Sequence, residues 1–288
     1  MATINTLITD FLEDLENKKK RSLRTVRNYD FYLRRFSCWA KKKKISDPEK
    51  ITEQVVKRYR LWLDKIESSV KKAKLKLNTQ TYHLIALRNY LKYLETEKIN
   101  SLSPKKVKLP RLVQTKVEYL EVPEIQDLFG APILVKQHKL FQARDRAILE
   151  LLYCTGLKVS EVARLTIHDL DLKKGLIMSA KRKITLTNQA KHWLQQYIKF
   201  RKKVDNEYLF IGHDRALHAR KPKALTPRSV ERIVKKYAQV ADIEKKVTPQ
   251  TLRHTYAINL IKKGDKIENI KKKLGYSVIS STLKYFEK

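Results

Sequence analysis

The sequence predicts a mainly α-helical protein with one small β-sheet, an α+β fold in two domains, and three observations predict it. Apolar residues recur with the 3.6-residue period of amphipathic helices through most of the chain. This period changes to a two-residue alternation around residues 166–187, which is typical of a short strand and a hairpin. Finally, 288 residues exceed one average domain, and the helical period stops near residue 100.

Residues 1–100 are expected to form a helical domain. Helices are predicted over residues 4–17, 22–44, 52–69 and 78–99. The first of them, INTLITDFLEDLEN, carries its apolar residues on one stripe, and the others repeat the pattern. Their inner faces would form a core that takes up most of the aromatic residues. Their outer faces are rich in Lys and Arg, which suit contacts with phosphate.

Residues 101–117 are expected to be an extended linker. The segment contains Pro104 and Pro110 together with several lysines, and it has no apolar stripe. Residues 118–288 would then form the second domain.

The second domain is expected to begin with a helix, because Pro123 occupies the position favoured at a helix start. A long buried helix then ends at Gly156, and a further helix follows that is capped by Ser160 or a neighbour. A short strand precedes a hairpin with arms over 175–179 and 183–187, joined by the basic turn AKRK. Helices are predicted over 188–203, 226–241, 249–263 and 266–274.

The charge of the chain points to a polyanionic partner. Its 64 Lys and Arg residues against 30 Asp and Glu give a formal charge of +34. Self-repulsion of this size is tolerable when a polyanion neutralises it, and double-stranded DNA is the leading candidate. A lysine-rich, solvated surface is the alternative explanation. If DNA binds, the affinity should fall steeply with salt because counterions are released.

Other classes of protein are disfavoured by what the sequence lacks. Cys38 and Cys154 have no CxxC spacing, so neither a disulfide framework nor a cysteine zinc site is expected. The N-terminus is no signal peptide, and the longest apolar run is too short for a membrane span. P-loop, GxGxxG, HExxH and two-metal patterns are missing. We expect a cytoplasmic, nucleoid-associated protein without metal, cofactor or membrane contact.

Five motifs follow one another in the second half: YCTGLKVSEVARL, the hairpin with AKRK, TPQTLRHTYAINLI, KKLGYSVISS and TLKYFEK. From about residue 114 to 288, this order and spacing resemble the catalytic domain of tyrosine recombinases, the phage-integrase and Xer-like family. That family shows TGLRxSE, a hairpin lysine, TPHxLRHTFA, LGH and then a tyrosine. The helical N-terminal half resembles its core-binding, SAM-like domain. The resemblance implies that both domains clamp DNA.

The resemblance also implies a reaction that needs neither metal nor ATP. A tyrosine hydroxyl attacks the scissile phosphate, which forms a 3′-phosphotyrosyl bond and frees a 5′-hydroxyl. Cationic side chains stabilise the charge of the transition state. A lysine protonates the departing 5′-oxygen, and a histidine assists proton transfer at the nucleophile.

Part of the family's site carries over directly. Tyr285 stands at the position of the nucleophile, and Arg253 stands at the second arginine. The general-acid lysine is either Lys181 or Lys183, since the short turn leaves two alignments, and Lys183 is favoured.

Three positions depart from the family. Lys158 replaces the first arginine, and it keeps the charge without the bidentate fork. Gln250 replaces the histidine, and it can donate a hydrogen bond but cannot act as a base near neutral pH. Tyr276 replaces the histidine or tryptophan, and its hydroxyl can still donate. His254, directly after Arg253, is interpreted as structural because neighbours on a helix point in different directions.

Two functions follow. The first is a site-specific DNA recombinase or integrase, with nicking and rejoining of the type IB topoisomerase kind as a variant. The alternative is an impaired or inactive recombinase-fold protein with an architectural or regulatory role. The retained Tyr285 and Arg253 favour the enzyme, whereas the three substitutions, whether natural or engineered, favour the alternative. A homodimer or homotetramer on DNA, or a pair with a partner recombinase, is expected. Integration, excision and dimer resolution are all compatible.

Overall fold

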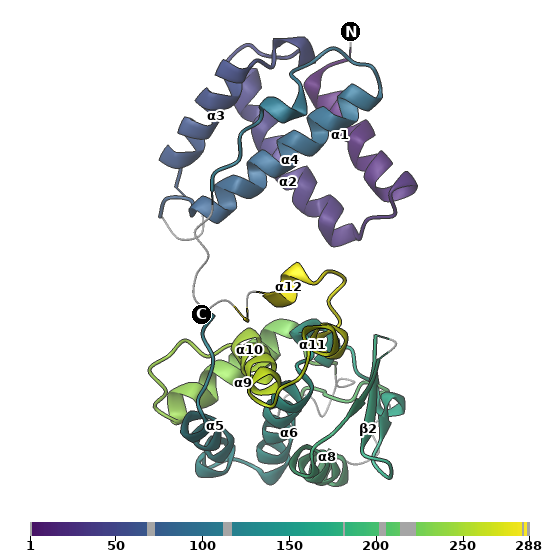
Figure 1. Ribbon diagram of the computed structural model, residues 1–288, viewed down its shortest axis with the longest axis vertical. Coiled ribbons are helices and arrows are strands. Elements are labelled where there is room, and N and C mark those ends of the chain that lie inside the picture. Colours follow the sequence, from purple (N-terminus) through teal and green to yellow (C-terminus); the bar gives the residue numbers. More distant parts are fainter. Residues whose placement is uncertain are drawn as a thin grey trace. The chain divides into compact units, whose positions relative to one another are not determined.

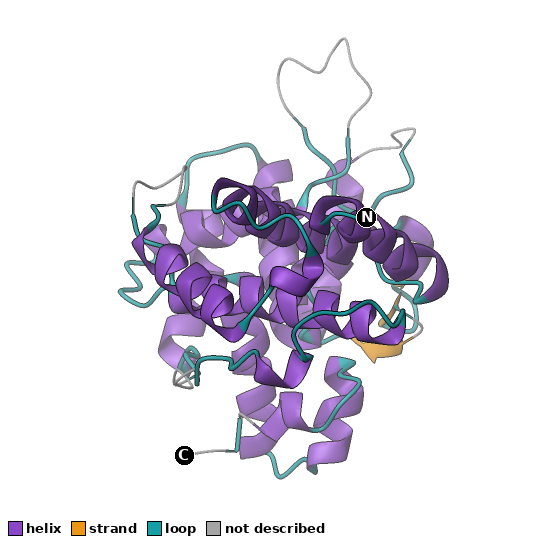
Figure 2. Cartoon of the chain, turned by 90° about the horizontal axis from the view of Figure 1, so that it is seen from above, coloured by secondary structure: helices purple, strands orange, loops and turns teal. Residues whose placement is uncertain are grey.

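The chain divides into two compact units, Met1–Gln114 and Thr115–Lys288 (Figure 1). The computed structural model describes residues 2–67, 73–111, 117–180, 182–201, 206–213, 223–283 and 285–286. Within these ranges both units are mainly helical (Figure 2), and one three-stranded sheet lies in the second unit. The predicted α+β class is confirmed. In the described ranges no helix is both long and apolar enough to cross a membrane.

The first unit is built from amphipathic helices around an aromatic-rich core. Its described α-helices are α1 (Ile4–Glu13), α2 (Leu23–Lys42), α3 (Glu53–Lys65) and α4 (Leu77–Thr96). A hydroxyl caps each of the first three, because Thr3, Ser22 and Thr52 accept a backbone N–H three residues on. The helix expected over 4–17 instead continues from α1 as a π-helical turn, η1 (Asp14–Lys18). The other predicted helices end a few residues earlier than their sequence patterns.

The start of the expected linker packs onto the first core. A 3₁₀ turn, η3 (Pro104–Lys106), places Val107 at 1% exposure, and Leu102 and Leu109 pack beside it. The sequence did not predict this because isolated apolar residues bury without forming a periodic stripe. Residues 112–116 lie outside the described part of the chain.

Helix α6 (Lys139–Thr155) is central to the second unit and packs against α5 (Val122–Leu134), α8 (Asn188–Arg201), α9 (Pro227–Val240) and α10 (Pro249–Lys262). It ends at Gly156, whose φ of +59° is left-handed. A Cβ at this position would lie 2.5 Å from the Tyr256 side chain, so glycine is required for two reasons. The remaining described α-helices are α7 (Val159–Val162), α11 (Ile267–Leu274) and α12 (Ser280–Leu283).

The sheet is antiparallel in the order β1 (Leu170–Asp171), β2 (Leu176–Ser179) and β3 (Arg182–Thr185). Ile177 pairs with Ile184, and Met178 pairs with Lys183. Since side chains alternate between the faces, Arg182 shares the core face with Ile184, and Lys183 lies on the opposite, exposed face.

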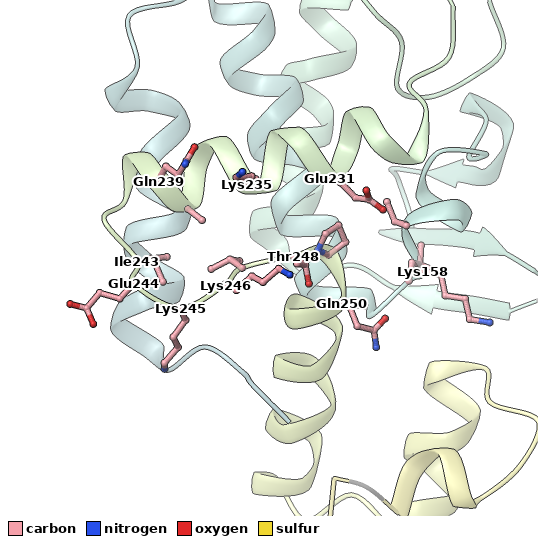
Figure 3. A pocket seen from close by; sticks show the side chains of 15 residues that line it. Lys158, Glu231, Lys235, Gln239, Ile243, Glu244, Lys245, Lys246, Thr248 and Gln250 are labelled. Atoms are coloured by element: carbon pink, nitrogen blue, oxygen red, sulfur yellow. The ribbon is translucent and has the colours of Figure 1, made fainter. Parts of the chain in front are cut away.

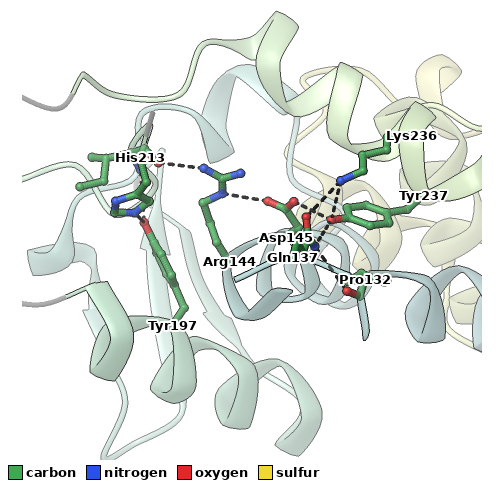
Figure 4. A network of polar contacts seen from close by, with 9 residues as sticks. Pro132, Gln137, Arg144, Asp145, Tyr197, His213, Lys236 and Tyr237 are labelled. Carbon is green, nitrogen blue, oxygen red and sulfur yellow. Dashed lines mark hydrogen bonds and ion pairs between the residues drawn. The ribbon is translucent and has the colours of Figure 1, made fainter. Parts of the chain in front are cut away.

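A buried polar network connects α6 with α9 (Figure 4). The Asp145 carboxylate accepts from Nε of Arg144 at 2.8 Å and from the Tyr237 hydroxyl at 2.8 Å. Arg144 also donates to the carbonyl oxygen of Ile211, and Gln137 donates to the Tyr237 hydroxyl at 2.7 Å. A buried carboxylate needs such partners, so removing one of them would leave a buried charge uncompensated and destabilise the second unit.

The first unit contains a buried histidine that should make its stability depend on pH. Nδ1 of His83 lies 2.9 Å from the carbonyl oxygen of Thr79, and Nε2 lies 3.3 Å from the Arg35 guanidinium. Because a carbonyl only accepts and a guanidinium only donates, the imidazole is neutral with its hydrogen on Nδ1. Burial, with a smaller contribution from Arg35, lowers the pKa of His83 from 6.5 to about 4.

We therefore expect the first unit to lose stability as the pH falls from about 6.5 towards about 4, because the unfolded chain binds the proton first. Urea unfolding followed by tryptophan fluorescence, with and without the His83→Gln change in a Trp193→Phe background, measures this, because Trp39 and Trp62 then report on the first unit alone. The difference in unfolding free energy between the two chains should change across that pH window. A difference that stays constant with pH would contradict the assignment.

Candidate active site

The predicted site residues that the structure describes all lie in the second unit. Lys158 precedes α7, Lys183 lies on β3, Gln250 and Arg253 lie on α10, Tyr276 follows α11, and Tyr285 follows α12. Lys181 lies outside the described residues.

The Arg253 guanidinium is the centre of the site and is 1% exposed. It donates to the carbonyl oxygen of Gly156 and, at 2.7 Å, to that of Leu274. These carbonyls lie at the C-terminal ends of α6 and α11, where unpaired carbonyls concentrate negative potential. One side chain therefore holds two helix ends together, and its own position is fixed.

Tyr276 connects this arginine to the predicted nucleophile. Its ring lies over the guanidinium, with Cζ of Arg253 4.7 Å from the ring centroid, and its Oη accepts from Nε at 3.3 Å. The Oη atoms of Tyr276 and Tyr285 are 3.1 Å apart. The substituted position thus links the second arginine to the tyrosine that the motif assigned as nucleophile.

The hydroxyl of Tyr285 is held in its protonated form. The side chain is 5% exposed and packs with Ala257, Leu260, Ile270 and Leu274. Burial raises the pKa of Tyr285 well above 10, the hydrogen bond to Tyr276 adds to the rise, and Arg253 acts in the opposite direction. A nucleophilic Tyr285 would therefore need a proton acceptor.

In the structure, the His254 ring contacts the Tyr285 ring. The sequence did not predict this contact, because His254 directly follows Arg253 and was interpreted as structural. The two rings meet edge to face, with centroids 5.5 Å apart and planes at 68°. Nε2 of His254 is 2.8 Å from the amide nitrogen of Gln250, and its Nδ1 is 3.3 Å from the carbonyl oxygen of Glu118. The i, i+4 spacing of Gln250 and His254 was the signal in the sequence, since it places both on one helix face.

Arg182 is a second residue that the motifs did not single out. It donates to Glu161 at 2.8 Å and to the carbonyl oxygen of Lys273 at 2.7 Å, so it joins β3, α7 and the end of α11. Glu161 also accepts from the backbone N–H of Lys158 at 2.7 Å. The turn at Gly275, with a φ of +66°, leaves room for the Arg182 guanidinium. The alternation of side chains along β3 was the signal in the sequence, since it places Arg182 on the same face as Ile184.

Two cavities with lysine-rich linings meet at the exposed Lys158. The first, of about 790 Å³, also includes Lys235, Lys245, Lys246 and Gln250, and Figure 3 shows Lys158 and Lys245 at its opposite ends. The second, of about 670 Å³, adds Arg182, Lys271, Lys272 and Tyr276. Such linings suit phosphate groups. Within the described residues, no cluster of His, Cys, Asp and Glu could hold a metal ion.

Each of the two units matches a known protein family. Residues 118–288 match the phage integrase family, and residues 8–98 match the phage integrase N-terminal SAM-like domain. The tyrosine recombinase XerC of Thermodesulfovibrio yellowstonii is 31% identical, over 96% of this chain and 90% of that protein. The tyrosine recombinase XerD of Staphylococcus epidermidis is 28% identical, over 98% and 94%.

Solved structures share the fold. XerA recombinase is similar with a TM-score of 0.52 and 25% identity, covering 99% of this chain and 94% of that one. The Tn1549 transposon integrase in complex with transposon right end DNA gives a TM-score of 0.74 at 20% identity, covering 99% and 95%. A lambda integrase dimer bound to a core site has a TM-score of 0.71 at 14% sequence identity. This similarity covers 99% of this chain and 95% of that one.

Replacing Tyr276 by Phe should lower the pKa of Tyr285, because the hydrogen bond from Tyr285 to Tyr276 is one of the causes that raise it. Burial remains, so the value should stay above that of an exposed tyrosine. NMR of chains labelled at tyrosine Cζ, with the Tyr285→Phe spectrum for assignment, shows at which pH the Tyr285 signal begins to titrate. The exposed Tyr208→Phe serves as the matched control. A Tyr285 signal that is unchanged, or that titrates at a higher pH, in Tyr276→Phe would contradict this account.

Proposed function

This chain belongs to the phage integrase family of tyrosine recombinases, and from this premise we propose that it is a site-specific DNA recombinase. It would cut and rejoin double-stranded DNA through a 3′-phosphotyrosyl intermediate, without metal or ATP. The matches over residues 8–98 and 118–288 support a core-binding role for the first unit and a catalytic role for the second. Its substrate would place it on the nucleoid in the cytoplasm.

One observation carries the proposal: Arg253, Tyr276 and Tyr285 form a continuous chain of polar contacts. Separate segments contribute these residues, and the contacts survive although Tyr276 is not the family's residue. In this role Arg253 and Tyr276 would donate to the non-bridging oxygens of the scissile phosphate, and Tyr285 would attack the phosphorus. Lys158 would add positive charge from the rim of both cavities.

The site is closed in this structure. Arg253 is 1% exposed and Tyr285 is 5% exposed, so neither reaches a phosphate at the surface. The proposal therefore includes an opening step in which Tyr285 leaves the Tyr276 hydroxyl and the phosphate takes its place. Phosphate oxygens would take the place of the Tyr285 hydroxyl beside Tyr276, and their negative charge would be attracted to the Arg253 guanidinium.

We also propose that the chain assembles on DNA as a homodimer or homotetramer, or with a partner recombinase. The printed description of the lambda integrase neighbour is a dimer on DNA, which supports this arrangement. The formal charge of +34 favours a DNA partner.

The closed, substituted site favours a second function, a recombinase-fold protein that binds DNA without cutting it. Lys158 and Gln250 lack the donor fork and the base of the family motif. Both functions require DNA binding, so covalent chemistry at Tyr285 discriminates them.

A suicide-substrate assay tests the choice. The chain is incubated with nicked duplexes carrying its recombination site, and the products are separated on a denaturing gel. We expect a covalent protein–DNA band from the parent chain and none from Tyr285→Phe. If the parent chain retards the duplex but forms no covalent band, the binding function is correct. An equal band in Tyr285→Phe would remove Tyr285 as the nucleophile.

Restoring the family residues should speed cleavage. Lys158→Arg returns the bidentate fork, and we expect the rate of covalent-complex formation to rise by up to roughly 10²–10³. Gln250→His returns a base, with a gain of up to about 10²–10⁴. Single-turnover rates on the nicked duplex measure both, with the exposed Lys199→Arg on α8 as a charge-preserving control outside the site. Unchanged rates would show that these positions do not limit the reaction.

A further inference from the structure

We propose that His254 is a catalytic residue that accepts the proton of the Tyr285 hydroxyl when this oxygen attacks phosphorus. This inference rests on the proposed function and deepens it, because it assigns to His254 the proton transfer that Gln250 cannot perform. Three features of the structure carry it: the tautomer of the imidazole, its contact with Tyr285, and its coupling to Gln250.

Two hydrogen bonds define the tautomer of His254. The carbonyl oxygen of Glu118, 3.3 Å from Nδ1, can only accept, so Nδ1 carries the hydrogen. The amide nitrogen of Gln250, 2.8 Å from Nε2, can only donate, so Nε2 carries a lone pair. Both bonds therefore describe the same neutral ring, with a basic nitrogen and an opposite nitrogen held by a backbone carbonyl. This carbonyl would also stabilise the imidazolium that forms when Nε2 takes up a proton.

The basic ring lies against the predicted nucleophile. The His254 and Tyr285 rings are in edge-to-face contact at 5.5 Å between centroids. Tyr285 also contacts Tyr276 through its hydroxyl, and the Tyr276 side chain, which contacts Arg253 in turn, has no basic nitrogen. Among the side chains in these contacts with Tyr285, only that of His254 is basic enough to accept a proton near neutral pH.

Gln250 connects proton transfer to the arrival of DNA. In the closed site its amide occupies Nε2 of His254, so the base is masked. Gln250 is exposed at the first turn of α10 and lines the lysine-rich cavity beside Lys158. A phosphate oxygen entering there would be a stronger acceptor for this amide than imidazole, because it is charged. Transfer of the Gln250 amide to the phosphate would release Nε2.

The step balances in atoms and charge. The Tyr285 oxygen forms a bond to phosphorus, and its proton moves to Nε2 of His254. The bond from phosphorus to the 5′-oxygen breaks, and this oxygen takes a proton from the hairpin lysine. In rejoining, the 5′-hydroxyl attacks phosphorus and gives its proton to the lysine, the bond from phosphorus to the Tyr285 oxygen breaks, and His254 returns its proton to that oxygen.

Three variants of the full chain test the assignment on the nicked duplex. His254→Gln keeps a side chain that can donate to Glu118 and accept from Gln250, but it has no basic nitrogen. His254→Ala leaves space for added imidazole. His192→Ala removes an exposed histidine of α8 and is the matched control. The readouts are the single-turnover rate of covalent-complex formation, duplex binding by gel retardation, and thermal unfolding.

We expect both His254 variants to form the covalent complex at least about 10²-fold more slowly, with duplex binding unchanged. Imidazole should restore the rate of His254→Ala in proportion to its concentration, and it should not affect His254→Gln or His192→Ala. A His254→Gln rate close to that of the parent, or failure of imidazole to rescue His254→Ala, overturns the assignment. Absence of a covalent band from the parent chain instead overturns the proposed function itself.

Discussion

The hydrogen bonds of one buried guanidinium organise the second unit. Arg253 donates to the last carbonyls of two helices, α6 and α11, which are far apart in the sequence. A buried positive charge is strongly unfavourable unless its donors are paired, so this arginine is stable only where both helix ends meet. Conversely, the helix ends have unpaired carbonyls that need a donor. The two requirements satisfy each other and determine where the residues around Arg253 lie.

The same constraint explains how the site tolerates substitution. Tyr276 places an aromatic ring over the guanidinium, and its hydroxyl accepts a hydrogen bond from Nε, so it meets two needs of the arginine. Arg182 and Glu161 hold the segment that carries Lys158 against the end of α11. Substitution at single positions therefore leaves the framework intact, and it changes mainly the chemistry available to the phosphate.

Burial has a second consequence. It excludes water from the Tyr285 side chain as well as from the Arg253 guanidinium. In the proposed enzyme, a buried, protonated Tyr285 beside a masked imidazole would stay unreactive until a phosphate competed for the same donors. The proposed recombinase would then be switched on by its substrate: the phosphate that is to be cut also removes the contacts that hold the nucleophile. For an enzyme that breaks DNA, such coupling limits cleavage to sites where DNA is fully engaged.

The sequence by itself determined the mainly helical fold class, the hairpin and the order of the site motifs. Amphipathic periods, the glycine at position 156 and the LRHTYA motif act locally, and local signals can be read without coordinates. Sequence patterns also singled out Tyr285 and Arg253 as candidate site residues, because those motifs have a fixed order. They did not predict the packing of Val107 on the first core, since a single apolar residue has no period.

Only the tertiary structure decided which side chains meet. The contact of His254 with Tyr285 and the bridge from Arg182 to Glu161 join residues 31 and 21 positions apart. The Tyr276–Tyr285 hydroxyl pair depends on the turn at Gly275 and on burial by α10 and α11. Hydrogen bonding and desolvation depend on distances set by packing between elements, and no linear pattern contains those distances. The candidate reacting groups can therefore largely be predicted from the sequence, whereas their protonation and accessibility are properties of the fold.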